Sequence, residues 1–314
     1  MLSKTGILMA LGAYGGLAAA LPTEDVPAAL ERAFIDPSFN HTEHLELASR
    51  AAGCGDPPAE NPRALCGALF QGDWKAAALA AAPQFNFARE NPSYEACYPE
   101  GATNTKGDGI NPGTGAPNGL SPGKDCTNPG KYTGSFSDGD PFPVYVDIRY
   151  CDGPQPTWRI LYNLYYVHDS THKHDWEVAA VVWKKTNHEG WWTRHAVVMS
   201  MHSKEKNYKW EDLFTVDGPE DKKRVEKDGG QKRNHPNLYI GMWKNGFFYN
   251  QKTSCHGQWC STNDDEYRSN DWVRIPTASE LKAASDLNKD WKWGGTTKPY
   301  DRMLKACDWE IPAI

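Results

Sequence analysis

The pattern of apolar and polar positions divides the chain into three regions. Residues 21–90 are rich in Ala, Leu and Glu at helical spacing, as in "VPAALERAF", "TEHLELASRAA" and "WKAAALAAA". Residues 91–142 lose this spacing and consist largely of Gly, Pro, Asn and Ser, which is typical of long loops. From about residue 143 onward, short runs of Val, Ile, Tyr and Trp predict β-strands. The pattern therefore predicts a helical extension at 21–90 followed by a β-rich domain.

Several predicted strands are almost continuously apolar, as expected for strands that are covered on both faces. Their number and spacing favour a largely antiparallel β-sandwich flanked by helices. The stretch "ASELKAASDLNKDW" near the C-terminus predicts a final helix. The predicted strands are "VYVDIRY", "WRILYNLYYV", "WEVAAVVWKK", "WWTRHAVVMS", "NLYIGMW" and "GFFYNQ".

The first twenty residues, "MLSKTGILMALGAYGGLAAA", have the pattern of a secretory signal peptide. Lys4 supplies the positive end, an apolar run follows, and Ala18 to Ala20 form a small-residue cleavage site. A membrane anchor would need roughly 20 uninterrupted apolar residues, and this run is shorter and broken by Gly. Secretion is therefore expected. The sequon at Asn40, Asn40-His41-Thr42, agrees with export and predicts glycosylation there.

Eight cysteines in a secreted chain allow up to four disulfides, although their spacing does not give the connectivity. Two pairs are close enough in sequence for local loops, and neither has zinc-finger spacing with partner histidines. These pairs are Cys54 with Cys66 and Cys255 with Cys260.

The formal net charge of −6 and the absence of a clustered basic face exclude nucleic acid as an expected partner. The one basic cluster, at 221–233, is interleaved with acids and glycines and indicates a solvated loop.

Ionisable residues are concentrated in "VHDSTHKHDWEVAAVVW", residues 167–183. If a strand begins near Asp175, then Asp175 and Glu177 share one face and Trp176 points to the core. Adjacent carboxylates are tolerated when one of them is protonated or when a cation lies between them. His172 and Asp169, in the preceding loop, are close enough in sequence to fold back to the same point.

Asp169, His172, Asp175 and Glu177 form a set of hard oxygen ligands with one imidazole. Such a set suits Ca²⁺ or Mg²⁺, and also Mn²⁺, better than structural zinc. The alternative is a polar hairpin whose charges are solvated or paired with Lys173, and the residue types alone do not decide between the two. The paired carboxylates also leave open a secreted polysaccharide hydrolase, although two same-face neighbours on one strand are poorly placed to flank a glycosidic bond.

The same segment resembles the heptapeptide GHRHDWE of the necrosis- and ethylene-inducing peptide 1-like family (the NPP1 domain). Thr171 stands in place of the glycine and Lys173 in place of the arginine. Weaker similarity covers about residues 91–305, so the NPP1-like domain is expected at 91–314. The matching residues of the heptapeptide are His172, His174, Asp175, Trp176 and Glu177.

The resemblance implies a secreted cytolysin or virulence effector with a β-sandwich related to actinoporins. It implies one bound divalent cation and contact with glycosylated sphingolipids of plant plasma membranes, without covalent chemistry. A monomer with only peripheral membrane contact is expected. A non-toxic, cation-dependent glycan- or lipid-binding relative is the alternative, because the family usually has a longer loop after the aspartate.

The resemblance also assigns roles to individual residues. It implies a disulfide between Cys97 and Cys126. The implied cation ligands are Asp169, His172, Asp175 and Glu177, and the implied supporting residues of the cavity are Lys173, His174, Trp176 and His202.

Overall fold

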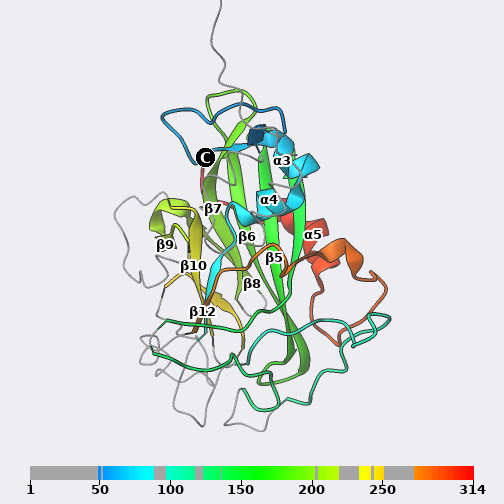
Figure 1. Cartoon of the computed structure of the whole chain (residues 1–314). Helices are drawn as coiled ribbons and strands as arrows, with labels where there is room; N and C mark the ends of the chain where they lie inside the picture. Colours follow the sequence, from blue (N-terminus) through cyan, green and yellow to red (C-terminus); the bar gives the residue numbers. More distant parts are fainter. Residues whose placement is uncertain are drawn as a thin grey trace, which may run out of the picture.

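The computed structural model of the chain is built on two β-sheets that share one core (Figure 1). This arrangement confirms the predicted mainly β fold with a sandwich of two sheets. The structure describes residues 49–50, 52–87, 97–116, 123–134, 136–201, 204–218, 233–241, 244–250 and 272–314.

The larger sheet has seven strands in the order β1-β7-β6-β5-β4-β13, and β8 also pairs with β7. The consecutive strands β4 to β8 are antiparallel, whereas the short β13 runs parallel to β4. Figure 1 shows β5, β6 and β7 as long green strands through the centre of the molecule. The strands are β1 (Leu65–Cys66), β4 (Val144–Cys151), β5 (Thr157–His168), β6 (Lys173–Lys185), β7 (Trp191–Met201), β8 (Lys204–Lys209) and β13 (Leu281–Ala283).

The second sheet has six strands in the order β11-β10-β2-β12-β3, and β9 also pairs with β10. Its strand β2 lies parallel to β10 on one side and antiparallel to β12 on the other. The strands are β2 (Gln84–Phe87), β3 (Ser137–Asp138), β9 (Thr215–Val216), β10 (His235–Ile240), β11 (Phe247–Phe248) and β12 (Trp272–Arg274).

The middle strand β6 is covered on both faces. Val181 and Trp183 belong to the main core, which also includes Phe85 of the second sheet. Val178 and Ala180 belong to a smaller cluster that is closed by Trp309, near the C-terminus. This double burial explains the nearly continuous apolar run of the strand and confirms the expectation drawn from it.

Short helices complete the fold. Asp73 caps α4 because its Oδ1 accepts a hydrogen bond from Ala76 N at 3.0 Å. The Tyr162 hydroxyl of β5 donates to Ala78 O at 2.6 Å and so holds α4 against the large sheet. The helices are α3 (Gly67–Gly72), α4 (Trp74–Leu79) and α5 (Pro299–Lys305), with 3₁₀ turns at η1 (Trp210–Asp212), η4 (Ala284–Asp286) and η5 (Ala306–Asp308).

Two expectations about helices need correction. The helix predicted for "ASELKAASDLNKDW" is wrong, because this stretch forms β13 and the turn η4. Leu281 of β13 is buried beside Val144, so pairing with the open edge of β4 outweighs the local helix propensity. Residues 65–87 likewise contribute β1 and β2 to the two sheets, and the predicted boundary near residue 91 does not separate them from the sandwich.

Three disulfides join described residues. The pairs Cys54–Cys66 and Cys97–Cys126 are confirmed. The third, Cys151–Cys307, joins the end of β4 to η5, and spacing in the sequence did not indicate it. Cys255, Cys260, Asn40, His202 and residues 1–20 lie outside the described residues, so the predictions made for them stay predictions.

Within the described residues, no helix is long and apolar enough to cross a bilayer.

Candidate functional site

The ionisable segment forms the turn between β5 and β6. The Asp169 carboxylate accepts hydrogen bonds from the backbone N–H groups of Thr171 and His172, at 2.6 and 2.7 Å, through Oδ1. The Asp169 N–H donates to His172 O at 3.0 Å and closes the turn. A short aspartate-capped turn of this kind is what only four residues between two paired strands allow. Asp169 therefore has a structural task inside its own turn.

A lysine from a distant part of the chain lies on this turn. The Lys244 ammonium is 3.0 Å from Asp169 Oδ2 and donates to Thr171 Oγ1 at 2.6 Å. The Thr171 hydroxyl in turn donates to Asp169 Oδ1 at 3.0 Å. Lys244 could not be predicted from the sequence, because a single lysine 75 positions from Asp169 carries no local signal.

The two carboxylates of β6 are buried and individually hydrogen-bonded. Asp175 and Glu177 are each 5% exposed. The Asn245 side-chain amide donates to Asp175 Oδ2 at 2.9 Å and also to His168 O at 3.1 Å. The Ser200 hydroxyl of β7 donates to Glu177 Oε2. Both carboxylates thus have a neutral partner within the protein.

The pKa values of the three acids at the turn shift in opposite directions. Burial raises the pKa of Asp175 to about 6 despite the Asn245 hydrogen bond, and the nearby charge of Asp169 adds to the rise. Burial, together with the charge of Asp175, also raises the pKa of Glu177. Burial disfavours ionisation of Asp169 as well, but the hydrogen bonds from Thr171 and His172 outweigh it and lower its pKa. Asp169 is the acid of the three that is held in its charged form.

Arg302 of α5 supplies a second fixed positive charge. Its guanidinium donates to Trp176 O, and its charge favours the ionised forms of both Asp175 and Glu177. Its Nη1 is buried and makes no hydrogen bond within the described part of the chain. The three acids therefore lie beside two positive charges, with Lys244 at Asp169 and Arg302 near Asp175 and Glu177.

The neighbouring residues frame the turn. Trp176 packs against Tyr145 and Trp293, with ring centroids 5.4 and 5.5 Å apart, and joins the core as predicted. His174 has a positive φ of 62°, an uncommon conformation for a residue with a side chain, and its Nδ1 lies 2.7 Å from the Tyr165 hydroxyl. Burial lowers the pKa of His174.

The Gly- and Pro-rich loop covers this part of β6. A Cβ at Gly113, where φ is +61°, would lie 2.6 Å from His174 Cε1, so only glycine fits there. The N–H groups of Glu100 and Thr114 donate to Tyr165 O and Val167 O on β5, at 2.9 and 3.1 Å. Gly113 thus allows this loop to pack closely against β6 at the site.

The four predicted ligands gather at one end of the β5–β6 hairpin. His172 Nε2 lies 3.4 Å from Asp169 Oδ2, but no three of these four described residues bring their ligand atoms within 4.8 Å of one another. Within the described residues, the one group of three or more His, Cys, Asp or Glu whose ligand atoms all lie within 4.8 Å of one another is Cys97, Cys126 and His168. Two of these are joined in a disulfide. The Asp169 carboxylate already pairs with the ammonium group of Lys244. In this arrangement Asp169 pairs with Lys244 and no three of the predicted ligand atoms meet, and the divalent cation stays a prediction.

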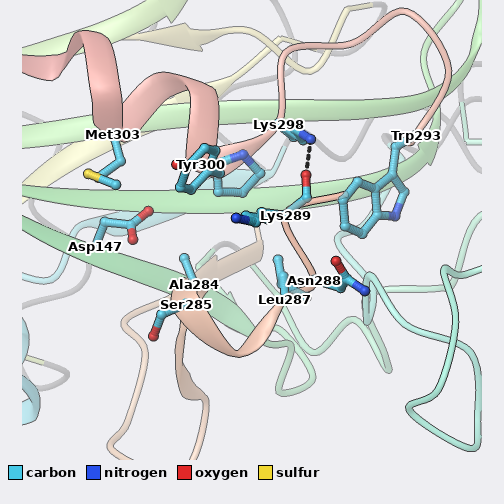
Figure 2. Close-up of a pocket in the computed structure, with 11 residues that line it drawn as sticks. Asp147, Ala284, Ser285, Leu287, Asn288, Lys289, Trp293, Lys298, Tyr300 and Met303 are labelled. Carbon is cyan, nitrogen blue, oxygen red and sulfur yellow. Dashed lines mark hydrogen bonds between the residues drawn. The ribbon is translucent and has the colours of Figure 1, made fainter. Parts of the chain in front are cut away.

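A separate cavity of about 410 Å³ lies between β4 and the C-terminal segment (Figure 2). Asp147 lies at its wall, and its Oδ2 is buried without a hydrogen bond from the described residues. Burial raises the pKa of Asp147 to about 7. Elsewhere on the cavity wall, the Lys298 ammonium donates a hydrogen bond to Lys289 O, as Figure 2 shows. The sequence analysis did not single out this cavity.

Comparisons with known proteins add structural neighbours only. No protein-family model matches the chain, and no curated protein matches it. The non-toxic HaNLP3 protein is 15% identical, with a TM-score of 0.40 over 73% of this chain and 88% of that one. NLPPya in complex with mannosamine is 15% identical, with a TM-score of 0.39 over 75% and 89% of the two chains.

A third neighbour is Necrosis and Ethylene inducing Protein 2 from the causal agent of cocoa's witches' broom disease. It is 18% identical, with a TM-score of 0.40 over 73% of this chain and 87% of that one. The structural neighbours are necrosis- and ethylene-inducing proteins. The likeness is distant, and at such TM-scores it carries no argument about the site.

Proposed function

We propose that the protein is secreted and binds the sugar head groups of sphingolipids in plant plasma membranes through the β5–β6 turn. The observation that carries this proposal is the heptapeptide match of His172, His174, Asp175, Trp176 and Glu177, whose residues lie together at one end of the hairpin. The proposal requires no covalent chemistry.

The chemistry of the turn suits a sugar. Thr171, His172 and Lys173 are exposed at the tip, above the buried Asp175 and Glu177. Sugar hydroxyls both donate and accept hydrogen bonds, so a surface that mixes a hydroxyl, an imidazole and an ammonium group can match them. The turn is held rigidly by Asp169, which lowers the ordering cost of binding.

Vesicle flotation tests this binding. The full secreted chain is mixed with vesicles that contain glycosylated plant sphingolipids, or with phosphatidylcholine vesicles alone. We expect flotation only with the sphingolipid vesicles, and at least a tenfold weaker association for the double variant His172→Ala/Lys173→Ala. Lys185→Ala, at the other end of β6, is the matched control and is expected to bind normally. Equal flotation with both vesicle types would contradict the proposal.

Lysis of the target membrane is the further activity that the proposal includes. Release of an entrapped dye from the same sphingolipid vesicles measures it directly. Binding without dye release would replace the cytolysin with the non-toxic binding protein, while leaving head-group recognition intact. The divalent cation is not part of the proposed binding step, because the carboxylates do not converge and Asp169 already pairs with Lys244.

A further inference from the structure

We propose that the Lys244 ammonium is a built-in counter-ion that takes the place of a divalent cation at the β5–β6 turn. This inference deepens the proposed function, on whose site it rests, by making the site independent of metal. It is tested by ion binding in the absence of lipid, so its failure and a failure of head-group binding are separate results.

Both oxygens of the Asp169 carboxylate already have partners. Its Oδ1 accepts from Thr171 N and His172 N, and its Oδ2 lies 3.0 Å from Lys244 Nζ. The Asp169 side chain is 5% exposed and that of Lys244 is 27% exposed, so the pair is largely shielded from water. A Ca²⁺ or Mg²⁺ ion needs a carboxylate oxygen at about 2.0–2.6 Å. Asp169 can provide one only by releasing the ammonium.

The residue next to Lys244, Asn245, is anchored by buried hydrogen bonds. Asn245 is 1% exposed, and its amide group bonds both Asp175 Oδ2 and His168 O. Its own N–H donates to Gly241 O at 3.0 Å, and its φ is +55°. Lys244 and Asn245 thus bond two members of the predicted ligand set, Asp169 and Asp175, from one short loop before β11. The lysine is placed by a buried, hydrogen-bonded neighbour and is not a free surface side chain.

The acids at the turn already have positive charges beside them. The three acids Asp169, Asp175 and Glu177 contribute at most three negative charges. Lys244 and Arg302 already contribute two positive charges beside them. A divalent ion at the turn would lie close to the Lys244 ammonium, which repels it.

Ion titration of the intact secreted chain tests the inference. After chelator treatment, calorimetry measures the binding of Ca²⁺, Mg²⁺ and Mn²⁺, and thermal unfolding is followed with and without each ion. For the natural chain we expect no saturable binding up to about 1 mM ion and an unchanged Tm. One ion bound with a submillimolar Kd, and lost in Asp175→Asn, would overturn the inference.

Variants at position 244 make the test reciprocal. Lys244→Met keeps the length of the side chain and removes its charge, so we expect it to gain an ion site at least tenfold tighter than the natural chain. Lys244→Arg keeps the charge and is expected to remain insensitive to the ions. A folded Lys244→Met chain that gains no ion binding would also overturn the inference. If that variant does not fold, the titration of the natural chain still decides.

Discussion

At the scale of single residues, the Asp169 side chain stabilises the β5–β6 turn. Asp169 was singled out in the sequence as a metal ligand, and the structure gives it the backbone N–H groups of a tight turn as partners. Its role follows from the loop length, because two residues between Asp169 and His172 leave the carboxylate within reach of its own backbone. The residue type suggested a metal ligand, but the short loop brings the Asp169 carboxylate against the backbone N–H groups of its own turn.

Replacement of Asp169 tests this account. Asp169→Ala removes the acceptor of two backbone N–H groups and leaves Lys244 without its carboxylate, so we expect a loss of about 2–4 kcal/mol in the free energy of unfolding. Urea denaturation of the variant and the natural chain measures it. Asp152→Ala is the control, because this exposed aspartate caps the β4–β5 turn through only one bond, to Gly153 N. Its expected loss is about 0.5 kcal/mol or less. Equal losses for both variants would contradict a special role for Asp169.

Asp147 provides a residue-scale prediction about pH. Burial raises its pKa from 3.8 to about 7, so the folded chain favours the protonated acid. Its contribution to stability is complete below about pH 4 and is lost as the pH rises through about 7. Asp147→Asn stays neutral, and we expect it to lose less stability than the natural chain between pH 5 and pH 8, by roughly 2 kcal/mol. Asp152→Asn, which removes an exposed carboxylate away from the cavity, should follow the natural chain. Parallel stability curves for all three chains would show that Asp147 is not the group that titrates.

At the scale of elements, local pattern and tertiary pairing compete. The long strands β5 to β7 lie where their apolar runs predicted, because burial on both faces leaves a strong pattern. Helix propensity at β13 was overruled by a sheet edge more than 130 residues away in sequence. Short elements carry few residues, so a distant partner decides their conformation.

The disulfides allow the stability of two attachments to be compared. Cys151–Cys307 joins residues 156 positions apart, whereas Cys54–Cys66 spans only 12. In the chain-entropy model, the longer loop constrains the unfolded chain more. We expect Cys151→Ser/Cys307→Ser to lose about 2 kcal/mol more in the free energy of unfolding than Cys54→Ser/Cys66→Ser. Guanidinium denaturation of the two double variants measures the difference, and equal losses would contradict it.

At the scale of the whole molecule, the sandwich is assembled from distant parts of the chain. Strand β2 lies in the interior of the second sheet, between β10 and β12, and α4 buries its alanines against the core. The segment that the sequence analysis placed in a separate helical extension therefore closes the main core. Removing it exposes both neighbouring strands.

Shortening the chain tests this dependence. A protein of residues 91–314 alone lacks β1, α3, α4 and β2, and we expect it to lose cooperative unfolding and its near-ultraviolet circular dichroism. The full chain, made in the same oxidising host, is the reference. A shortened chain that unfolds cooperatively would show that residues 91–314 form an independent domain.

The sequence by itself determined those features that depend on neighbouring residues. Alternation placed Trp176 in the core and Asp175 and Glu177 together, and apolar runs placed the long strands, because side-chain direction and burial follow from position along one strand. Only the tertiary structure decided which charges meet. Lys244 and Asn245 come from one loop and Arg302 from a helix, all far from the turn in sequence, and the Cys151–Cys307 pair and the placement of β2 are equally long-range. Such contacts arise when the whole chain closes around its core, so no local pattern records them.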